Sequence, residues 1–314
     1  MKKLFYLSGI ALLVITVLAC NKISDKSKGP LFMAGIGTSK GCSVYCVNID
    51  SGEVVNSTPI DGYVLGSTTF DPTTGGYGYV GTDSVFRLLD PQTGSLLSSI
   101  KMPGYLSLVT IDPGNNMLVG LYTVITYGPD PDSSGSKSSN TGPAIYTNYV
   151  LRASLTTDKI ISEKVVDIGD GASLGCYYFN QAEGTYVLLR SDMSLIYINP
   201  STGNVVKEVY VGQFLTNAIY NPENNTIISI PYSAVEDRNY VVVTNAGTGA
   251  ELSRKIIDRE DGYVFGVSGY DPVNNWYITQ NSSLDIIFYD ISTGATVKKF
   301  KPDNGLSEIK IWRK

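Results

Sequence analysis

One pattern recurs six times along this chain and constrains its fold more than any other feature. Each copy has a short apolar run, a turn that ends in Gly or Asp, and a second short apolar run. Glycine readily adopts the positive φ that such hairpin turns need, and aspartate tolerates it better than most residues. We therefore expect each copy to form a β-hairpin. The turn residues are Gly52, Gly94, Asp158, Gly203, Gly249 and Gly294.

A second type of turn alternates with the first. It begins with Asp-Pro, Asn-Pro or Asn-Gln and is flanked by apolar runs on both sides, as in FDPTTGGY (70–77) and YDPVNNW (270–276). The two turns together define a unit of four strands that repeats mostly every ~41 to 50 residues. That period is typical of a propeller blade. We predict an all-β, six-bladed β-propeller made of four-stranded antiparallel blades.

The two ends of the chain indicate how this ring closes. The first unit opens at LFMAGIG (31–37) without an innermost strand, and the last unit is followed by a surplus strand, GLSEIKIW (305–312). We predict that the C-terminal strand becomes the innermost strand of the first blade, which leaves no open sheet edge at the join. A seven-bladed propeller, a β-sandwich or two smaller domains are the alternatives.

The N-terminus has the features of an export signal. Lys2 and Lys3 precede an apolar run from Leu4 to Leu18, which is too short for a confident membrane span. The following Val17-Leu18-Ala19-Cys20 resembles the lipobox of bacterial lipoproteins, and the resemblance implies that Cys20 carries the lipid. A plain secretory signal is the alternative. Asn21 after the cysteine favours the outer membrane.

These features divide the chain into three parts. We predict a signal peptide over 1–20, a flexible polar tether over 21–30 and the propeller over 31–314. The protein is then exported and anchored in the cell envelope through the lipid on Cys20. Nothing in the sequence predicts an oligomer, so we expect a monomer.

Composition excludes several functions. The chain has no histidine, which removes Ser-His-Asp catalysis and histidine metal or haem ligation. Two of the 24 basic residues lie in the signal, so the mature chain has 22 basic and 29 acidic residues and a net charge of −7. Nucleic-acid binding favours a basic face instead. We predict no catalytic residue, no metal, no cofactor and no nucleic-acid partner.

The chain also contains one long polar insertion and three cysteines after Cys20. The polar insertion at 128–143 has acidic residues spaced as in a calcium loop but lacks the closing Glu, so it is interpreted as a polar insertion. It lies within a long loop, 123–145, for which a flap over a ligand is one hypothesis and a passive decoration the other. Cys42, Cys46 and Cys176 lack a pairing pattern and are expected to be free thiols.

The repeat units resemble the YVTN-like and quinoprotein-like propeller group. LIYINPSTGNVV (195–206) and IIFYDISTGATV (286–297) show its strand, Asp or Asn, Thr-Gly, strand unit. The resemblance implies the fold and no particular activity, because these propellers serve as scaffolds, binders and enzymes. The chain departs from the quinone-dependent members, since it has two tryptophans and no adjacent cysteines.

The candidate ligand site lies in the connections from one blade to the next. They contain Asp-Gly and aromatic residues and are expected near the central channel, on the face opposite the turns described above. Aromatic and carboxylate groups together suit a sugar, a peptide with basic groups or a cation. The alternative is that these residues form turns and pack between blades. The candidate residues are Asp61, Tyr63, Tyr105, Asp170, Phe214, Asp261, Tyr263 and Asp303.

Two functions follow from this site. The first is a cell-envelope lipoprotein that acts as a non-catalytic ligand- or protein-binding module, with an unknown protein, peptide or glycan as ligand. The second is a histidine-free propeller enzyme, a lyase or hydrolase that uses Asp and Tyr near the central channel. A cluster of carboxylates with perturbed pKa values would favour the enzyme, and a broad aromatic surface would favour binding.

Overall fold

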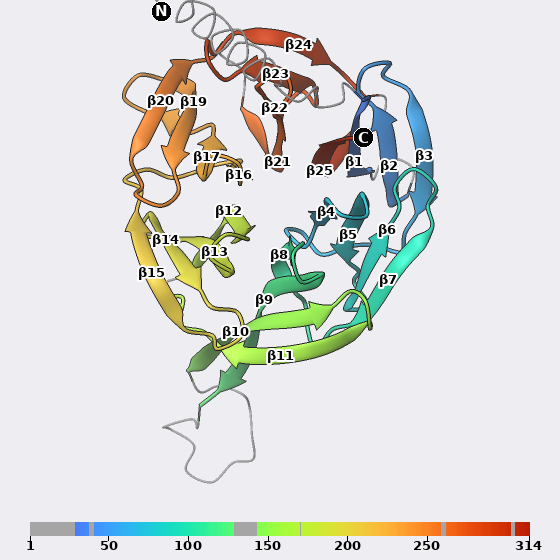
Figure 1. Ribbon diagram of the computed structural model, residues 1–314, viewed down its shortest axis with the longest axis vertical. Coiled ribbons are helices and arrows are strands. Elements are labelled where there is room, and N and C mark those ends of the chain that lie inside the picture. Colours follow the sequence, from blue (N-terminus) through green and yellow to red (C-terminus); the bar gives the residue numbers. More distant parts are fainter. Residues whose placement is uncertain (1–28, 38–40, 129–142, 170, 259–261, 303–304) are drawn as a thin grey trace, which may run out of the picture.

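The computed structural model describes residues 29–37, 41–128, 143–169, 171–258, 262–302 and 305–314. Within these ranges every regular element is a β-strand, and the strands form six antiparallel sheets arranged in a ring (Figure 1). The six-bladed propeller that the turn pattern predicts is therefore confirmed. The described residues contain no helix that is long and apolar enough to span a membrane. The signal, most of the tether and the centre of the long insertion lie outside these ranges.

Each blade runs from an innermost strand at the channel to an outermost strand at the rim. Blade 1 consists of β25 (Leu306–Arg313), β1 (Leu31–Gly37), β2 (Ser43–Asn48) and β3 (Val54–Pro59). Blade 2 consists of β4 (Thr69–Asp71), β5 (Gly76–Val80), β6 (Val85–Leu89) and β7 (Leu96–Lys101). Blade 3 consists of β8 (Ser107–Asp112), β9 (Met117–Tyr127), β10 (Ala144–Ser154) and β11 (Lys159–Val165).

The remaining blades follow the same order. Blade 4 consists of β12 (Ala172–Asn180), β13 (Thr185–Arg190), β14 (Ser194–Ile198) and β15 (Val205–Tyr210). Blade 5 consists of β16 (Ile219–Asn221), β17 (Thr226–Ser229), β19 (Arg238–Asn245) and β20 (Glu251–Ile256), with the short β18 (Tyr232–Ser233) paired to the start of β19. Blade 6 consists of β21 (Tyr263–Asp271), β22 (Trp276–Asn281), β23 (Ile286–Asp290) and β24 (Thr296–Phe300).

The C-terminal strand closes the ring as predicted. β25 pairs antiparallel with β1, with Phe32 opposite Trp312 and Met33 opposite Ile311, and so becomes the innermost strand of blade 1. It is also fastened to blade 6, because Arg313 forms an ion pair with Asp271 at 2.5 Å. The first and last segments of the propeller are therefore joined by both a strand ladder and a buried charge pair.

Both turn series have the backbone geometry that their residues predict. The six hairpin turn residues all have positive φ, from 54° at Asp158 to 80° at Gly294. The alternate series ends at Gly75, Asn116, Gly184, Asn225 and Asn275, which also have positive φ. In a four-stranded antiparallel blade the first and third connections lie on the same side. Both series therefore lie on one face, called the Asp-Pro face; the opposite side is the connection face.

The apolar core is divided among the interfaces between blades. The described residues form six buried clusters, and each joins side chains of two neighbouring blades. The cluster between blades 2 and 3, for example, packs Phe86 and Leu88 against Leu118 and Leu151. Because a blade buries its apolar faces only against its neighbours, the ring must be complete for the core to be complete.

Three buried tyrosines link neighbouring blades through their hydroxyl groups. Tyr77 donates to the Glu308 carbonyl at 2.8 Å, Tyr186 to the Leu108 carbonyl at 2.5 Å, and Tyr277 to the Asn217 carbonyl at 2.5 Å. Each tyrosine lies on the second strand of an even-numbered blade. Each acceptor lies on or next to the innermost strand of the preceding blade and has positive φ: Glu308, Leu108 and Asn217. These bonds fix the spacing of the innermost strands around the channel.

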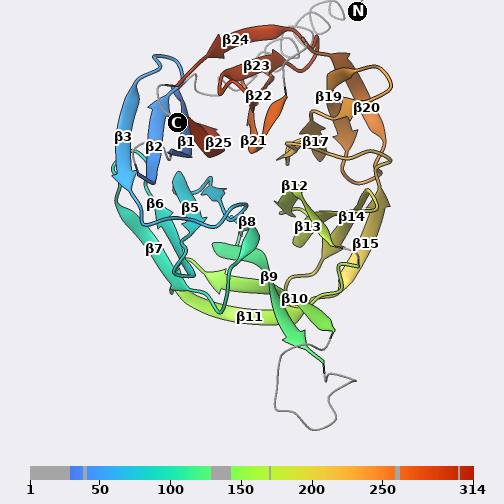
Figure 2. The same cartoon turned by 180° about the vertical axis from the view of Figure 1, so that it is seen from behind.

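The long insertion of blade 3 differs from the sequence-based expectation. β9 and β10 stay paired from Ser154↔Met117 out to Ala144↔Tyr127, so residues 123–127 and 144–145 are strand rather than loop. β-Branched and aromatic residues such as Val124, Ile125 and Tyr146 favour this extension. The hairpin projects beyond the rim of the ring in both axial views (Figures 1 and 2). The candidate calcium loop and the centre of the proposed flap lie outside the described residues.

Both ends of the described chain lie on the Asp-Pro face. β1 begins there because it is the second strand of its blade, and β25 ends there because it is the first. The two ends touch: the Arg313 guanidinium donates to the Gly29 carbonyl at 2.6 Å, and the Lys314 amide donates to the Pro30 carbonyl at 3.3 Å. Gly29, the first described residue, therefore lies on the Asp-Pro face.

Candidate functional site

The central channel contains a cavity of about 300 Å³. Side chains on or next to the innermost strands of all six blades line it, from Thr69 on β4 to Lys310 on β25. Turn residues of four blades also line it, and all of them belong to the Asp-Pro face: Pro72, Pro113, Gln181 and Pro222. The cavity is therefore at the end of the channel that lies on the Asp-Pro face.

Aromatic side chains form one wall of this cavity. β12 contributes Tyr177, Tyr178 and Phe179, β16 contributes Tyr220, and Phe70 comes from β4 on the other side. The rings of Tyr178 and Tyr220 are stacked, with centroids 4.0 Å apart and planes 13° apart. This stack joins blades 4 and 5 and gives the cavity a flat apolar surface against which another ring or an aliphatic group can pack.

A buried hydroxyl pair holds this wall in place from behind. The Tyr178 and Tyr197 hydroxyl oxygens are 3.4 Å apart, and Tyr197 donates to the Ala246 carbonyl of blade 5 at 2.5 Å. Burial raises the pKa of Tyr197 to about 12, which keeps the hydroxyl protonated and able to donate at neutral pH. The position of the aromatic wall is thus fixed by contacts outside the cavity.

Lys310 is the only charged residue among the described residues that line the cavity. Its ammonium group makes no hydrogen bond or ion pair with another described residue. Burial lowers the pKa of Lys310 from its ordinary value of 10.5, and the nearby Glu308 carboxylate opposes that shift. The cavity therefore contains a cationic donor group that has lost much of its contact with water and has no partner among the residues that the structure describes.

Tyr177 supplies a second donor group. Its hydroxyl makes no hydrogen bond with another described residue, and the side chain faces the cavity. Burial raises the pKa of Tyr177, and the Glu308 carboxylate adds to that shift. Tyr177 and Lys310 both line this one cavity, so it contains two donor groups.

Glu308 itself lies behind the cavity wall and has a structural role. Glu308 is a buried residue, with 3% of its surface exposed. One carboxylate oxygen accepts the Gly66 amide at 2.9 Å, and the other accepts the Thr68 hydroxyl at 2.6 Å. Both partners belong to the approach to β4, so this carboxylate joins blade 1 to blade 2 and does not pair with Lys310.

Further hydrogen bonds join residues on or next to neighbouring innermost strands around the channel. The Leu108 amide donates to the Gly66 carbonyl at 2.9 Å, and the Gly266 amide donates to the Asn217 side-chain oxygen at 3.0 Å. Gly66, Leu108, Asn217, Gly266 and Glu308 all have positive φ. The backbone therefore has a left-handed residue on or next to the innermost strand in five blades. Hydrogen bonds join several of these positions around the channel.

The sequence-predicted site residues occupy other positions. Tyr63 packs at the interface of blades 1 and 2 and lies 3.0 Å from the Ser307 hydroxyl, while Tyr263 packs between blades 5 and 6 and lies 2.9 Å from the Tyr289 hydroxyl. Tyr105 and Phe214 are exposed, at 61% and 46%. Asp61 lines a separate shallow pocket that also includes Arg87.

Asp170, Asp261 and Asp303 lie outside the described residues. None of the five described candidates lines the central cavity, and a binding role for the eight candidate residues stays a prediction.

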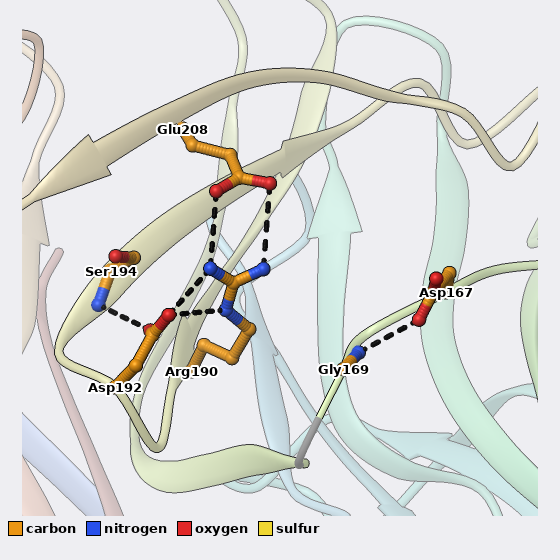
Figure 3. Close-up of polar contacts among 6 residues, drawn as sticks. All are labelled: Asp167, Gly169, Arg190, Asp192, Ser194 and Glu208. Carbon is orange, nitrogen blue, oxygen red and sulfur yellow. Dashed lines mark hydrogen bonds and ion pairs between the residues drawn. The ribbon is translucent and has the colours of Figure 1, made fainter.

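The connection face near blade 4 contains a group of paired charges (Figure 3). Arg190 on β13 forms ion pairs with Asp192 at 2.5 Å and with Glu208 on β15 at 3.1 Å. Close by, the Gly169 amide donates to the Asp167 carboxylate at 2.9 Å, directly before Asp170 (Figure 3). These acidic groups already have partners within blade 4 and its connection.

Sequence reasoning missed the cavity because it placed the candidate site in the connections between blades rather than at the ends of the innermost strands. One signal was present. In four of the five alternate turns, the residue directly before the Asp or Asn is aromatic: Phe70, Phe179, Tyr220 and Tyr270. Three of these line the cavity. Lys310 carries no comparable signal, since it becomes part of the channel only because β25 closes the ring.

The fold and the cavity define a six-bladed β-propeller with an aromatic central site. No known family model matches the chain, and no curated protein matches it in sequence. Among solved structures, the chain is similar to TolB from Acinetobacter baumannii, with a TM-score of 0.60 and 12% sequence identity. The match covers 94% of this chain and 69% of that one. At this identity the likeness shows the fold.

Proposed function

We propose that this protein is a non-catalytic binding propeller of the cell envelope, anchored by a lipid on Cys20, which takes its ligand in the central cavity. Its repeat units relate it to YVTN-like and quinoprotein-like propellers. The cavity is the observation that carries the proposal: an aromatic wall, held rigid from behind, combined with two donor groups that have no partner in the described protein. Ligand sites have this composition, mostly apolar with a few placed polar groups.

The exit of the tether supports the envelope part of this proposal. Gly29 and Pro30 contact the end of β25 on the Asp-Pro face, which is also the face on which the cavity lies. Eight residues separate Cys20 from Gly29, and the nine Cα-to-Cα steps span at most about 30 Å when fully extended. A lipid on Cys20 would hold the mouth of the cavity within that distance of the membrane, so the ligand would come from the membrane or its surface.

A cavity-filling substitution tests whether the channel binds ligands. Saturation-transfer NMR would be recorded for the probes phenol, N-acetylglucosamine and the dipeptide Gly-Phe with the native protein and with Thr110→Trp. Thr110 lines the cavity, whereas Ser282→Trp adds the same bulk to an exposed position between β22 and β23 as a control.

The proposal expects at least one probe to bind the native protein and Ser282→Trp but not Thr110→Trp. Thermal melting would establish that both variants are folded. The proposal is wrong if no probe binds the native protein, or if binding is unchanged when Thr110→Trp fills the cavity.

A further inference from the structure

Lys310 is the feature of the cavity that the fold alone does not explain. Charged groups inside proteins are normally paired, because moving an unpaired charge out of water is costly. The only acidic side chain described next to it in the channel is Glu308, whose oxygens accept hydrogen bonds from Gly66 and Thr68. A lysine that serves only the fold would gain from an ion pair that this arrangement does not provide.

Resting on the function proposed above, we propose that the cavity binds the carboxylate end of an organic ligand whose body is aromatic or otherwise apolar. The Lys310 ammonium would pair with the carboxylate, and the Tyr177 hydroxyl would donate a hydrogen bond to its second oxygen. Hydrogen bonds of this kind to a charged group are shorter and stronger than those between neutral groups.

The charge of the site favours a carboxylate over other ions. One ammonium and one phenol hydroxyl match a monoanion with two oxygens. A phosphate ester carries a larger negative charge, and among the described residues lining the cavity there is no second cation to balance it. The mature chain also has a net charge of −7, which repels a multiply charged anion more strongly than a monoanion. A cationic ligand would be repelled by the Lys310 ammonium group.

The walls and the volume define the rest of the ligand. The Tyr178–Tyr220 stack and the side chains of Val109, Ile111 and Ile219 provide apolar surface. A cavity of about 300 Å³ is at the lower end of the range of roughly 300–1,000 Å³ for small-molecule sites. It accommodates one ring with a short chain, so a larger ligand would place only its carboxylate end inside.

Calorimetric titration with a matched pair of probes tests this inference. The acid 3-phenylpropionate and the alcohol 3-phenylpropan-1-ol have the same ring and chain length, and only the acid can form an ion pair. Both would be titrated into the purified full-length protein, Lys310→Met, Tyr177→Phe and Lys159→Met. Lys159 is exposed on the outer strand β11 and is the control for loss of a positive charge.

We expect the native protein to bind the acid about 10- to 100-fold more tightly than the alcohol, the range that a charge-assisted hydrogen bond supports. Lys310→Met should abolish this preference and leave the alcohol affinity within about twofold of native. Tyr177→Phe should reduce the preference, and Lys159→Met should keep it.

Two results would overturn the inference. The first is equal binding of acid and alcohol by the native protein, which leaves the proposed binding function standing. The second is a preference for the acid that persists in Lys310→Met. If neither probe binds the native protein, the inference fails, and the proposed function is then decided by the saturation-transfer experiment with phenol, N-acetylglucosamine and Gly-Phe.

A second pair of probes separates the two sources of a carboxylate. N-acetyl-Gly-Phe with a free C-terminus represents the end of a polypeptide, and its C-terminal amide is the control. Tighter binding of this peptide acid than of 3-phenylpropionate, lost in the amide, supports a polypeptide C-terminus as the source. Tighter binding of 3-phenylpropionate supports a small free acid. Either result requires the same dependence on Lys310.

Discussion

The hairpin turn residues share a backbone conformation but differ in their surroundings. Gly52 and Gly249 have φ values of 76° and 74°. A Cβ atom at Gly52 would meet nothing within 4 Å, whereas one at Gly249 would lie 2.2 Å from the Tyr210 carbonyl oxygen of the preceding blade. Gly249 therefore has two roles: it allows the turn, and it lets blade 5 dock closely on blade 4.

We predict different stability losses for alanine at these two glycines. Gly52→Ala should cost about 1 kcal/mol, the ordinary penalty for a side chain in the left-handed region. Gly249→Ala should cost about 3 kcal/mol or more, because the turn must also move away from Tyr210. Urea unfolding of both variants measures the difference. Equal losses would mean that the contact between blades relaxes without cost.

The second prediction at the scale of single residues concerns Lys310. Burial lowers its pKa below the ordinary value of 10.5, so the unfolded chain binds this proton more tightly than the folded protein. The charged lysine thus opposes folding at neutral pH, and stability should rise with pH between the lowered pKa and 10.5. Lys310→Met should raise the Tm at neutral pH, with a gain that shrinks toward pH 10.5.

Thermal melts of the native protein and Lys310→Met across that pH range measure this effect, with Lys159→Met as the control for an exposed lysine. A lower Tm for Lys310→Met at neutral pH would contradict the account. It would mean that the lysine stabilises the fold, and that its position in the cavity needs no ligand to explain it.

Among the structural elements, β25 is the one that joins the two ends of the ring. It supplies Leu306 and Ile309 to the core between blades 1 and 6 and pairs with β1. Asp271 of blade 6 is fully buried. The Arg313 guanidinium of β25 donates to both of its carboxylate oxygens, at 3.2 and 2.5 Å. The strand therefore closes the ring by a ladder on one side and by a bidentate ion pair on the other.

We predict that this ion pair matters far more than an exposed one. Arg313→Met leaves the Asp271 carboxylate buried without its charge partner and should cost about 3–5 kcal/mol. Arg87→Met removes a similar pair with Asp83, in which the side chains are 28% and 51% exposed, and should cost less than about 1 kcal/mol. Denaturant unfolding compares the two. Similar small losses would show that β25 does not need the pair to close the ring.

The same element shows what the sequence could and could not predict about the fold. The missing first strand and the surplus last strand predicted the closure. Each repeat has four strands, so the surplus strand fills the place that is empty in the first blade. The extension of β9 and β10 beyond the blade was not predicted, since Gly, Ser and Pro in the insertion obscured the strand-forming residues at its base, such as Val124 and Ile145. Patterns that repeat are visible in a sequence, and a single local extension is not.

At the scale of the whole molecule, the site was harder to predict than the fold. Asp-Gly and aromatic residues in the blade connections directed the prediction to the connection face, whereas the cavity lies at the Asp-Pro face. Its lining comes from six strands far apart in the sequence, and Lys310 joins them only through the closing strand. Such convergence depends on ring geometry, so the residues carry no common motif beyond the aromatic residue before four of the five alternate turns.

The positions of the two tryptophans provide a test of orientation on the membrane. Trp276 begins β22 and Trp312 is near the end of β25, so both lie toward the Asp-Pro face, where Gly29, the first described residue, also lies. If Cys20 carries the proposed lipid, we predict strong energy transfer from tryptophan to dansyl-labelled lipids when the lipidated protein is bound to vesicles. Cys20→Ser should remain soluble and show none, and a flexible insertion after Lys28 should weaken the transfer. Transfer that is independent of tether length would contradict this orientation.

The central claim is that the channel of this propeller is a ligand site with Lys310 as its anchor. A crystal structure of the protein soaked with 4-bromophenylacetate tests it most directly, because bromine is located by its anomalous scattering. The account predicts one bromine site in the channel beside the Tyr178–Tyr220 stack, with the carboxylate on Lys310. Bromine found only outside the channel, or in the channel with the carboxylate directed away from Lys310, would contradict it.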